Sequence, residues 1–223
     1  MLFLVQQGKL SSSNISAGST QHHSVNYSNS YIKDLLFEWL RRTKHVWGWY
    51  VSEVEPMHAI GIFSVSRRLE VYQTIIFEYL DLDRYFTSII DNFSRLEKEL
   101  SILAHNMQVF LDKEEIVING ERVRPRVIGV DIGFKGEPEE PYVAYFIFFK
   151  GKPVKGMNYY ENIYEEEVAE YPFSVYWYFP PSAKIIEVEA SGETEIVGDN
   201  ILIIRVNEGN KISGYEKIVF EIR

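Results

Sequence analysis

Short hydrophobic runs, separated by turn residues, follow one another from residue 107 to the C-terminus. Apolar and polar positions alternate in many of these runs, and a period of two places successive side chains on opposite faces of a β-strand. Asn119-Gly120 between two such runs is a strong signal for a two-residue hairpin. Strands without interleaved helices predict an antiparallel β-sandwich or barrel instead of a parallel α/β sheet. The predicted strands are 107–111, 116–118, 121–123, 127–132, 142–149, 173–179, 184–190, 200–206 and 217–222.

The region before residue 107 mixes the helical and the strand period. Residues 31–44 predict an amphipathic helix that caps the sandwich, and residues 89–104 predict a second helix. Within the second helix, Ser94-Arg95-Leu96-Glu97 has the spacing of a capping box. Residues 71–80 fit a strand and also a helical face. Two further strands are predicted, at 47–51 and 57–66, and the acidic stretch 161–170 fits a short helix or a loop.

Residues 1–30 differ from the rest of the chain, because Ser and Asn dominate and Lys9 is the one Lys, Arg, Asp or Glu side chain. Such a segment buries too little apolar surface to offset the entropy lost on ordering. We therefore expect an N-terminal arm, followed by a single domain over 31–223. The apolar start Met1–Val5 is far shorter than a signal peptide or a membrane span, so we expect a cytoplasmic protein.

Charge and composition exclude several functions. The formal net charge is −9, which repels a phosphate backbone, so we expect no direct contact with nucleic acid. The chain has no cysteine, which excludes thiol catalysis and cysteine-ligated metal centres. Ile, Glu, Lys and Tyr are abundant, a mixture typical of hyperthermophilic proteins.

Aromatic residues make up 15% of the chain, and two predicted strands carry bulky rings at positions that reach both faces of a sheet. One face can be core, whereas the other is covered by a helix, such as 31–44, or forms a subunit interface. The apolar N-terminus is also suited to a groove on a neighbouring molecule. The candidate interface residues are therefore Leu2, Phe3, Leu4, Trp47, Trp49, Tyr176 and Tyr178.

One motif suggests chemistry. The strand 127–133 ends in Asp131-Ile132-Gly133, and it resembles the first hairpin of ribonuclease-H-like and actin-like folds. In those folds such an aspartate holds a metal ion or lies near nucleotide phosphates. They also require alternating helices and strands, whereas residues 173–223 predict strands and turns. A cytoplasmic archaeal metal- or nucleotide-dependent enzyme that uses Asp131 is therefore the alternative hypothesis.

Other candidate chemistry is weak. Adjacent carboxylates such as Glu139-Glu140 point to opposite faces of a strand, and the five histidines match no metal-ligand pattern. Phosphate-binding and nucleophile motifs are absent from the sequence. Asn14, Asn26 and Asn92 begin N-glycosylation triplets, which leaves a cell-surface binding module as a third hypothesis. We assign no catalytic residue, metal ligand or cofactor.

Taken together, the Ser/Asn-rich arm 1–30, the cysteine-free strand-rich body 31–223 and the hyperthermophile-like composition resemble the vertex proteins of turreted icosahedral viruses of thermoacidophilic archaea. The resemblance is one of architecture and length, without a shared motif. It implies a viral jelly roll with one or two accessory helices and an extended arm.

The same resemblance implies a capsid protein of the penton base or turret, located in the virion after assembly in the host cytoplasm. Its partners would be copies of itself and other capsid proteins, with the arm reaching toward a membrane-associated protein. The sequence therefore predicts a structural subunit and not an enzyme.

Overall fold

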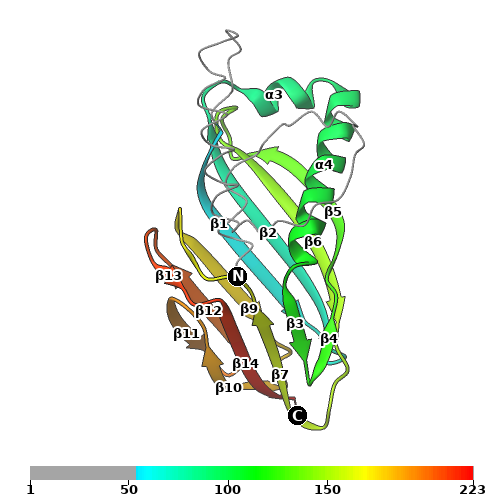
Figure 1. Cartoon of the computed structure of the whole chain (residues 1–223), viewed down its shortest axis with the longest axis vertical. Helices are drawn as coiled ribbons and strands as arrows, with labels where there is room; N and C mark the ends of the chain where they lie inside the picture. The colour runs from blue at the N-terminus through cyan, green and yellow to red at the C-terminus, as the bar shows by residue number, and fades with distance from the viewer. Residues whose placement is uncertain (1–53, 223) are drawn as a thin grey trace, which may run out of the picture. The chain divides into compact units, whose positions relative to one another are not determined.

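The computed structural model of the chain describes residues 54–222 (Figure 1). The arm at 1–30, the helix predicted at 31–44 and the strand predicted at 47–51 lie outside these residues. The described part is mostly β, with two sheets of five or more strands, a small strand pair and two helices.

The larger sheet has seven strands, and β1 and β2 form the long hairpin near its middle. All its neighbours are antiparallel except β1 and β9, which run parallel from Ala59↔Phe173 to Ser64↔Tyr178. The expectation of a purely antiparallel sandwich is therefore wrong at this pair. Residues 66–172 separate β1 from β9 along the chain, and such a long connection permits parallel pairing. In spatial order the strands are β11 (Glu193–Val197), β12 (Ile201–Val206), β9 (Phe173–Tyr178), β1 (Val54–Val65), β2 (Glu70–Asp81), β6 (Pro141–Lys150) and β5 (Arg126–Phe134).

The smaller sheet has five strands, all antiparallel. Its edge strands β4 and β10 continue directly into β5 and β11, the edge strands of the larger sheet, so the chain joins the sheets at both lateral edges. The Asn119-Gly120 hairpin between β3 and β4 is confirmed, with positive φ at both residues. In spatial order the strands are β10 (Ala183–Glu189), β14 (Tyr215–Ile222), β7 (Gly156–Ile163), β3 (Glu115–Ile118) and β4 (Glu121–Val123); β8 (Glu167–Val168) pairs separately with β13 (Lys211–Ile212).

One hydrophobic core contains residues of both sheets, which is compatible with a β-sandwich. Trp177 of β9 stacks on Phe63 of β1, with ring centroids 3.9 Å apart. Tyr160 of β7, in the other sheet, lies 4.7 Å from the Trp177 ring. Each such ring removes roughly 150–250 Å² from water, so this cluster contributes strongly to holding the two sheets together.

Two helices, α3 (Tyr85–Ile90) and α4 (Phe93–Leu111), follow β2. The buried face of α4 comprises Leu103, Met107 and Leu111, which recur every four residues. The strand predicted at 107–111 is therefore wrong, because Met107 and Leu111 continue the helical period. The predicted capping box is also wrong, since Asn92 caps the helix and its side chain accepts a hydrogen bond from the Arg95 N–H at 3.1 Å.

The sequence pattern missed β7, because its inward side chains are partly polar. Asn158 is buried there and accepts hydrogen bonds from the Val154 N–H at 3.0 Å and from Asn119 Nδ2 at 2.8 Å. It also donates to the carbonyl of Gly156 at 2.9 Å, so its amide is satisfied without water. The edge strand β11 was missed as well. The ambiguous stretch at 71–80 is strand β2, and 161–170 contains the end of β7, a loop and β8.

Candidate subunit-binding surface

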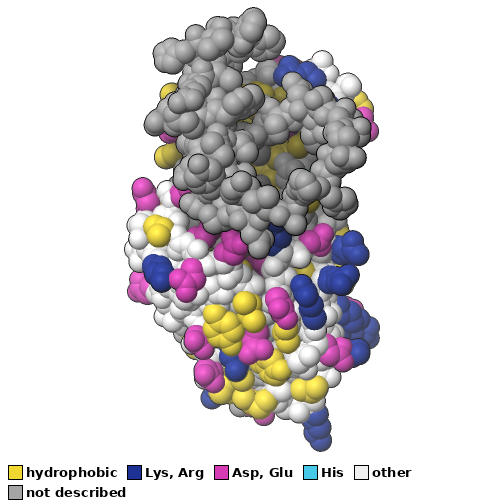
Figure 2. Space-filling view, in the orientation of Figure 1, with side chains coloured by type: hydrophobic (Ala, Val, Ile, Leu, Met, Phe, Trp, Pro, Cys, Tyr) yellow, Lys and Arg dark blue, Asp and Glu magenta, His cyan; other side chains and the backbone are white. Residues whose placement is uncertain are grey.

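The outer face of the five-stranded sheet is mixed in polarity. Lys217 and Glu161 are opposite each other on β14 and β7, with Nζ and Oε1 3.6 Å apart, and the Tyr215 hydroxyl donates to Glu161 Oε1 at 3.0 Å. Figure 2 shows charged side chains interspersed with hydrophobic ones on the surface over β14, β7 and β3. This alternation is the usual pattern for a sheet face that meets water.

The outer face of the seven-stranded sheet is different, because its middle is apolar. The register places Ile60 opposite Ile76 and Tyr72 opposite Phe148, and residues directly opposite share a face. Ser64, Ser174 and Thr74 are the small polar residues among them. We call the apolar set the aromatic face; it comprises Ile60, Ile62, Tyr72, Ile76, Tyr142, Ala144, Phe146, Phe148, Tyr176, Tyr178, Ile201 and Ile203.

Charged pairs lie around the rim of the aromatic face. Lys150 Nζ is 2.8 Å from Glu70 Oε1, and hydrogen bonding to Lys150 lowers the pKa of Glu70. On another side, Arg205 Nη1 is 2.9 Å from Glu195 Oε2. An apolar centre with a polar rim is typical of protein–protein interfaces.

Two glycines of β5 allow aromatic rings to lie close to the backbone at one edge of this face. A Cβ at Gly129 would lie 3.2 Å from Cδ2 of Phe146, and a Cβ at Gly133 would overlap the Tyr142 ring. The rings therefore occupy the space that larger β5 side chains would need, as aromatic residues commonly do beside strand glycines. Packing thus accounts for the glycines of the Asp131 motif without any ligand.

Asp131 itself is exposed on β5, opposite Ala144 of β6. Within residues 54–222, no three His, Asp or Glu side chains form a group that could hold a metal ion. Among the described residues, Asp131 therefore belongs to no such group of three.

The aromatic face is large enough to matter for binding. The face spans five strands that are about 4.8 Å apart, and it extends over about six residues per strand, each with a rise of roughly 3.3 Å. The product of these two lengths is a flat area of about 500 Å². The largest apolar patch on an ordinary monomer is about 300–600 Å² and is often functional. Of its members only Tyr72, Phe146 and Tyr178 are exposed, so the accessible area is smaller than this outline and would form the centre of a standard interface, which buries about 800 Å² on each partner.

The predicted interface residues divide into two groups. Tyr176 and Tyr178 lie on the aromatic face, while Trp177 between them is in the core. The other five, Leu2, Phe3, Leu4, Trp47 and Trp49, lie outside the described residues. Tyr72 and the β6 rings were not predicted as interface residues, although Tyr142–Phe149 is apolar at every position. A strand that is apolar on both faces signals that its second face is covered.

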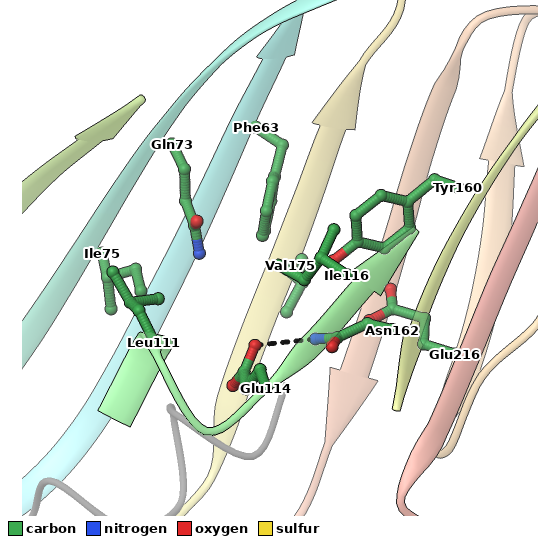
Figure 3. Close-up of a pocket in the computed structure, with 10 residues that line it drawn as sticks. All are labelled: Phe63, Gln73, Ile75, Leu111, Glu114, Ile116, Tyr160, Asn162, Val175 and Glu216. Atoms are coloured by element: carbon green, nitrogen blue, oxygen red, sulfur yellow. Dashed lines mark hydrogen bonds between the residues drawn. The ribbon is translucent and has the colours of Figure 1, made fainter. Parts of the chain in front are cut away.

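A small cavity of about 10 Å³, lined by apolar and polar side chains, lies between the sheets (Figure 3). Asn162 Nδ2 donates to Glu114 Oε2 at 2.8 Å there. Burial raises the pKa of Glu216, and the charge of Glu114 adds to the shift. Because a space of this size holds about one water molecule, the cavity is a polar position in the core and not a substrate site.

No protein-family model and no curated protein matches the chain. Neither α3 nor α4 combines the length and the apolar character that a bilayer-spanning helix needs.

Proposed function

We propose that this protein is a structural subunit that assembles with copies of itself and with other proteins through the aromatic face. The observation that supports the proposal is the contrast between the two sheet faces. The outer face of the smaller sheet has mixed charge, whereas the outer face of the larger sheet carries Ile, Tyr and Phe, with Tyr72, Phe146 and Tyr178 exposed. Only the second has the composition of an interface centre.

The resemblance to archaeal virus vertex proteins suggests the kind of assembly. In this proposal the chain is a capsid-vertex subunit of the penton base or turret, located in the virion, with the arm 1–30 making interlocking contacts. The finer fold is then a jelly roll. The observed fold and a jelly roll both consist of two packed sheets. The parallel β1–β9 pair, however, departs from an all-antiparallel jelly roll.

Light scattering over a range of concentrations tests this function. We expect the full chain to form a defined oligomer whose mass falls on dilution. A chain that lacks residues 1–30 should keep the circular dichroism of a folded β protein but assemble less. A full chain that stays monomeric at every concentration, alone and with candidate partner subunits, would contradict the proposal; normal assembly of the truncated chain would remove the arm from it.

A further inference from the structure

A groove of about 330 Å³ lies where the link between β4 and β5 passes the end of α4. Three arginines from five consecutive positions line it: Arg122, Arg124 and Arg126. Asp112 and Glu114 also line the groove, and they come from the short segment between the end of α4 and the start of β3. Figure 2 shows basic side chains gathered on the side of the molecule where Figure 1 places β4 and β5.

These arginines have no acidic partner among residues 54–222, although the chain carries nine more acidic than basic side chains. Elsewhere in the described part, Lys150 and Arg205 have such partners, whereas Arg67 and Lys155 have none, so the distinguishing feature of the three arginines is that they line one groove. Three guanidinium groups without acidic partners repel one another when they line the same groove. An anion bound there would offset this repulsion, so the groove is suited to bind one.

The backbone that carries the arginines is held by one side chain of α4. Gln108 Nε2 donates to the carbonyl of Pro125 at 3.1 Å, and Gln108 Oε1 accepts from the Val127 N–H at 3.0 Å. Both polar ends of the amide therefore hold the backbone from Pro125 to Val127, which includes Arg126 and directly follows Arg124. A segment fixed before binding loses less entropy when a ligand arrives, which raises affinity.

We propose that this groove binds a small phosphate-bearing anion. Guanidinium groups match phosphate oxygens with paired hydrogen bonds, and the groove volume is that of a small-molecule site. The groove-lining carboxylates of Asp112 and Glu114 accept hydrogen bonds from Gln108 and Asn162. Their negative charge repels an anion, so the anionic end of the ligand would lie against the arginines. A long polyanion is disfavoured by the net charge of −9.

Isothermal titration calorimetry of the full chain with pyrophosphate tests the proposal. We expect binding, and each single change Arg122→Gln, Arg124→Gln or Arg126→Gln should weaken it about tenfold, since one charge-assisted hydrogen bond is lost. A triple variant with all three groove arginines changed to glutamine should bind more weakly still, and its matched control is Arg67→Gln/Arg68→Gln/Lys155→Gln, which removes the same charge outside the groove. This control should bind pyrophosphate as the parent does.

Two further measurements sharpen the result. Gln108→Leu leaves all three arginines in place but removes the hydrogen bonds from Gln108 to the backbone at Pro125 and Val127. Weaker pyrophosphate binding by this variant would therefore support a preorganised site over simple charge attraction. Parallel titrations use sulfate, a glutamate-rich peptide and a single-stranded oligonucleotide. Absence of pyrophosphate binding at millimolar concentration, equal loss in the charge-matched control, or binding of the peptide or oligonucleotide alone would each overturn the proposal.

Discussion

Replacing Tyr72 and Phe146 by serine tests the aromatic face at its most accessible rings. Tyr72 is 58% exposed and Phe146 is 40% exposed, so neither change creates a cavity in the core. An aromatic side chain offers roughly 150–250 Å², so a partner could cover about 80–120 Å² on each ring. At about 25 cal/mol per Å², each ring contributes about 2–3 kcal/mol to association.

Sedimentation equilibrium measures the consequence. The double variant should stay folded, but its dissociation constant should be at least a hundredfold higher than that of the parent. A loss of about 3 kcal/mol of association free energy already corresponds to more than a hundredfold. The control is Met157→Ser/Ile186→Ser on the smaller sheet, where the two side chains are 50% and 48% exposed. Equal weakening by both variants, or unchanged association of the Tyr72→Ser/Phe146→Ser variant, would refute the assignment of the interface to the aromatic face.

Two further predictions concern the sandwich itself. Because burial raises the pKa of Glu216, the stability from its neutral form is complete below pH 4.5 and is lost as the pH rises through the folded pKa. Glu216→Gln should therefore flatten the pH dependence of urea unfolding and stabilise the protein at neutral pH; an unchanged slope would contradict this. Gly133→Ala should destabilise by about 1–3 kcal/mol through overlap with Tyr142, whereas Asp131→Ala on the same strand should change the unfolding midpoint little. Equal midpoints for these two variants would show that the glycine is not required.

Local sequence signals predicted much of the described fold. The β3–β4 hairpin follows from Asn119-Gly120, and nine predicted strands coincide with β1, β3–β6, β9, β10, β12 and β14, while the stretch 71–80, left open between strand and helix, is β2. These signals succeed where one strand face is apolar and the turn residues determine the local register. They fail at the end of α4, where two patterns overlap. Met107, Val109 and Leu111 fit the strand period of two, but Met107 and Leu111 also continue the helical spacing of four from Leu103.

Tertiary contacts explain the other differences. Strand β7 carries buried Asn158 and Asn162, whose partners Asn119 and Glu114 are distant in sequence, so its inward face is not apolar. The parallel β1–β9 pair likewise depends on a long connection that no local pattern encodes. For the candidate site, the pattern identified Tyr176 and Tyr178, whereas the alignment of their strand with β12 and β1 emerged only from the register.

Cysteine labelling reports whether the aromatic face is occupied, because the chain has no cysteine of its own. Ser174→Cys introduces a thiol among the aromatic-face residues, and Lys184→Cys introduces one on the outer face of the smaller sheet. We expect labelling of Ser174→Cys to slow as the protein concentration rises through the assembly range, while labelling of Lys184→Cys stays constant. A labelling rate for Ser174→Cys that is the same at every concentration would mean that no second subunit covers this face.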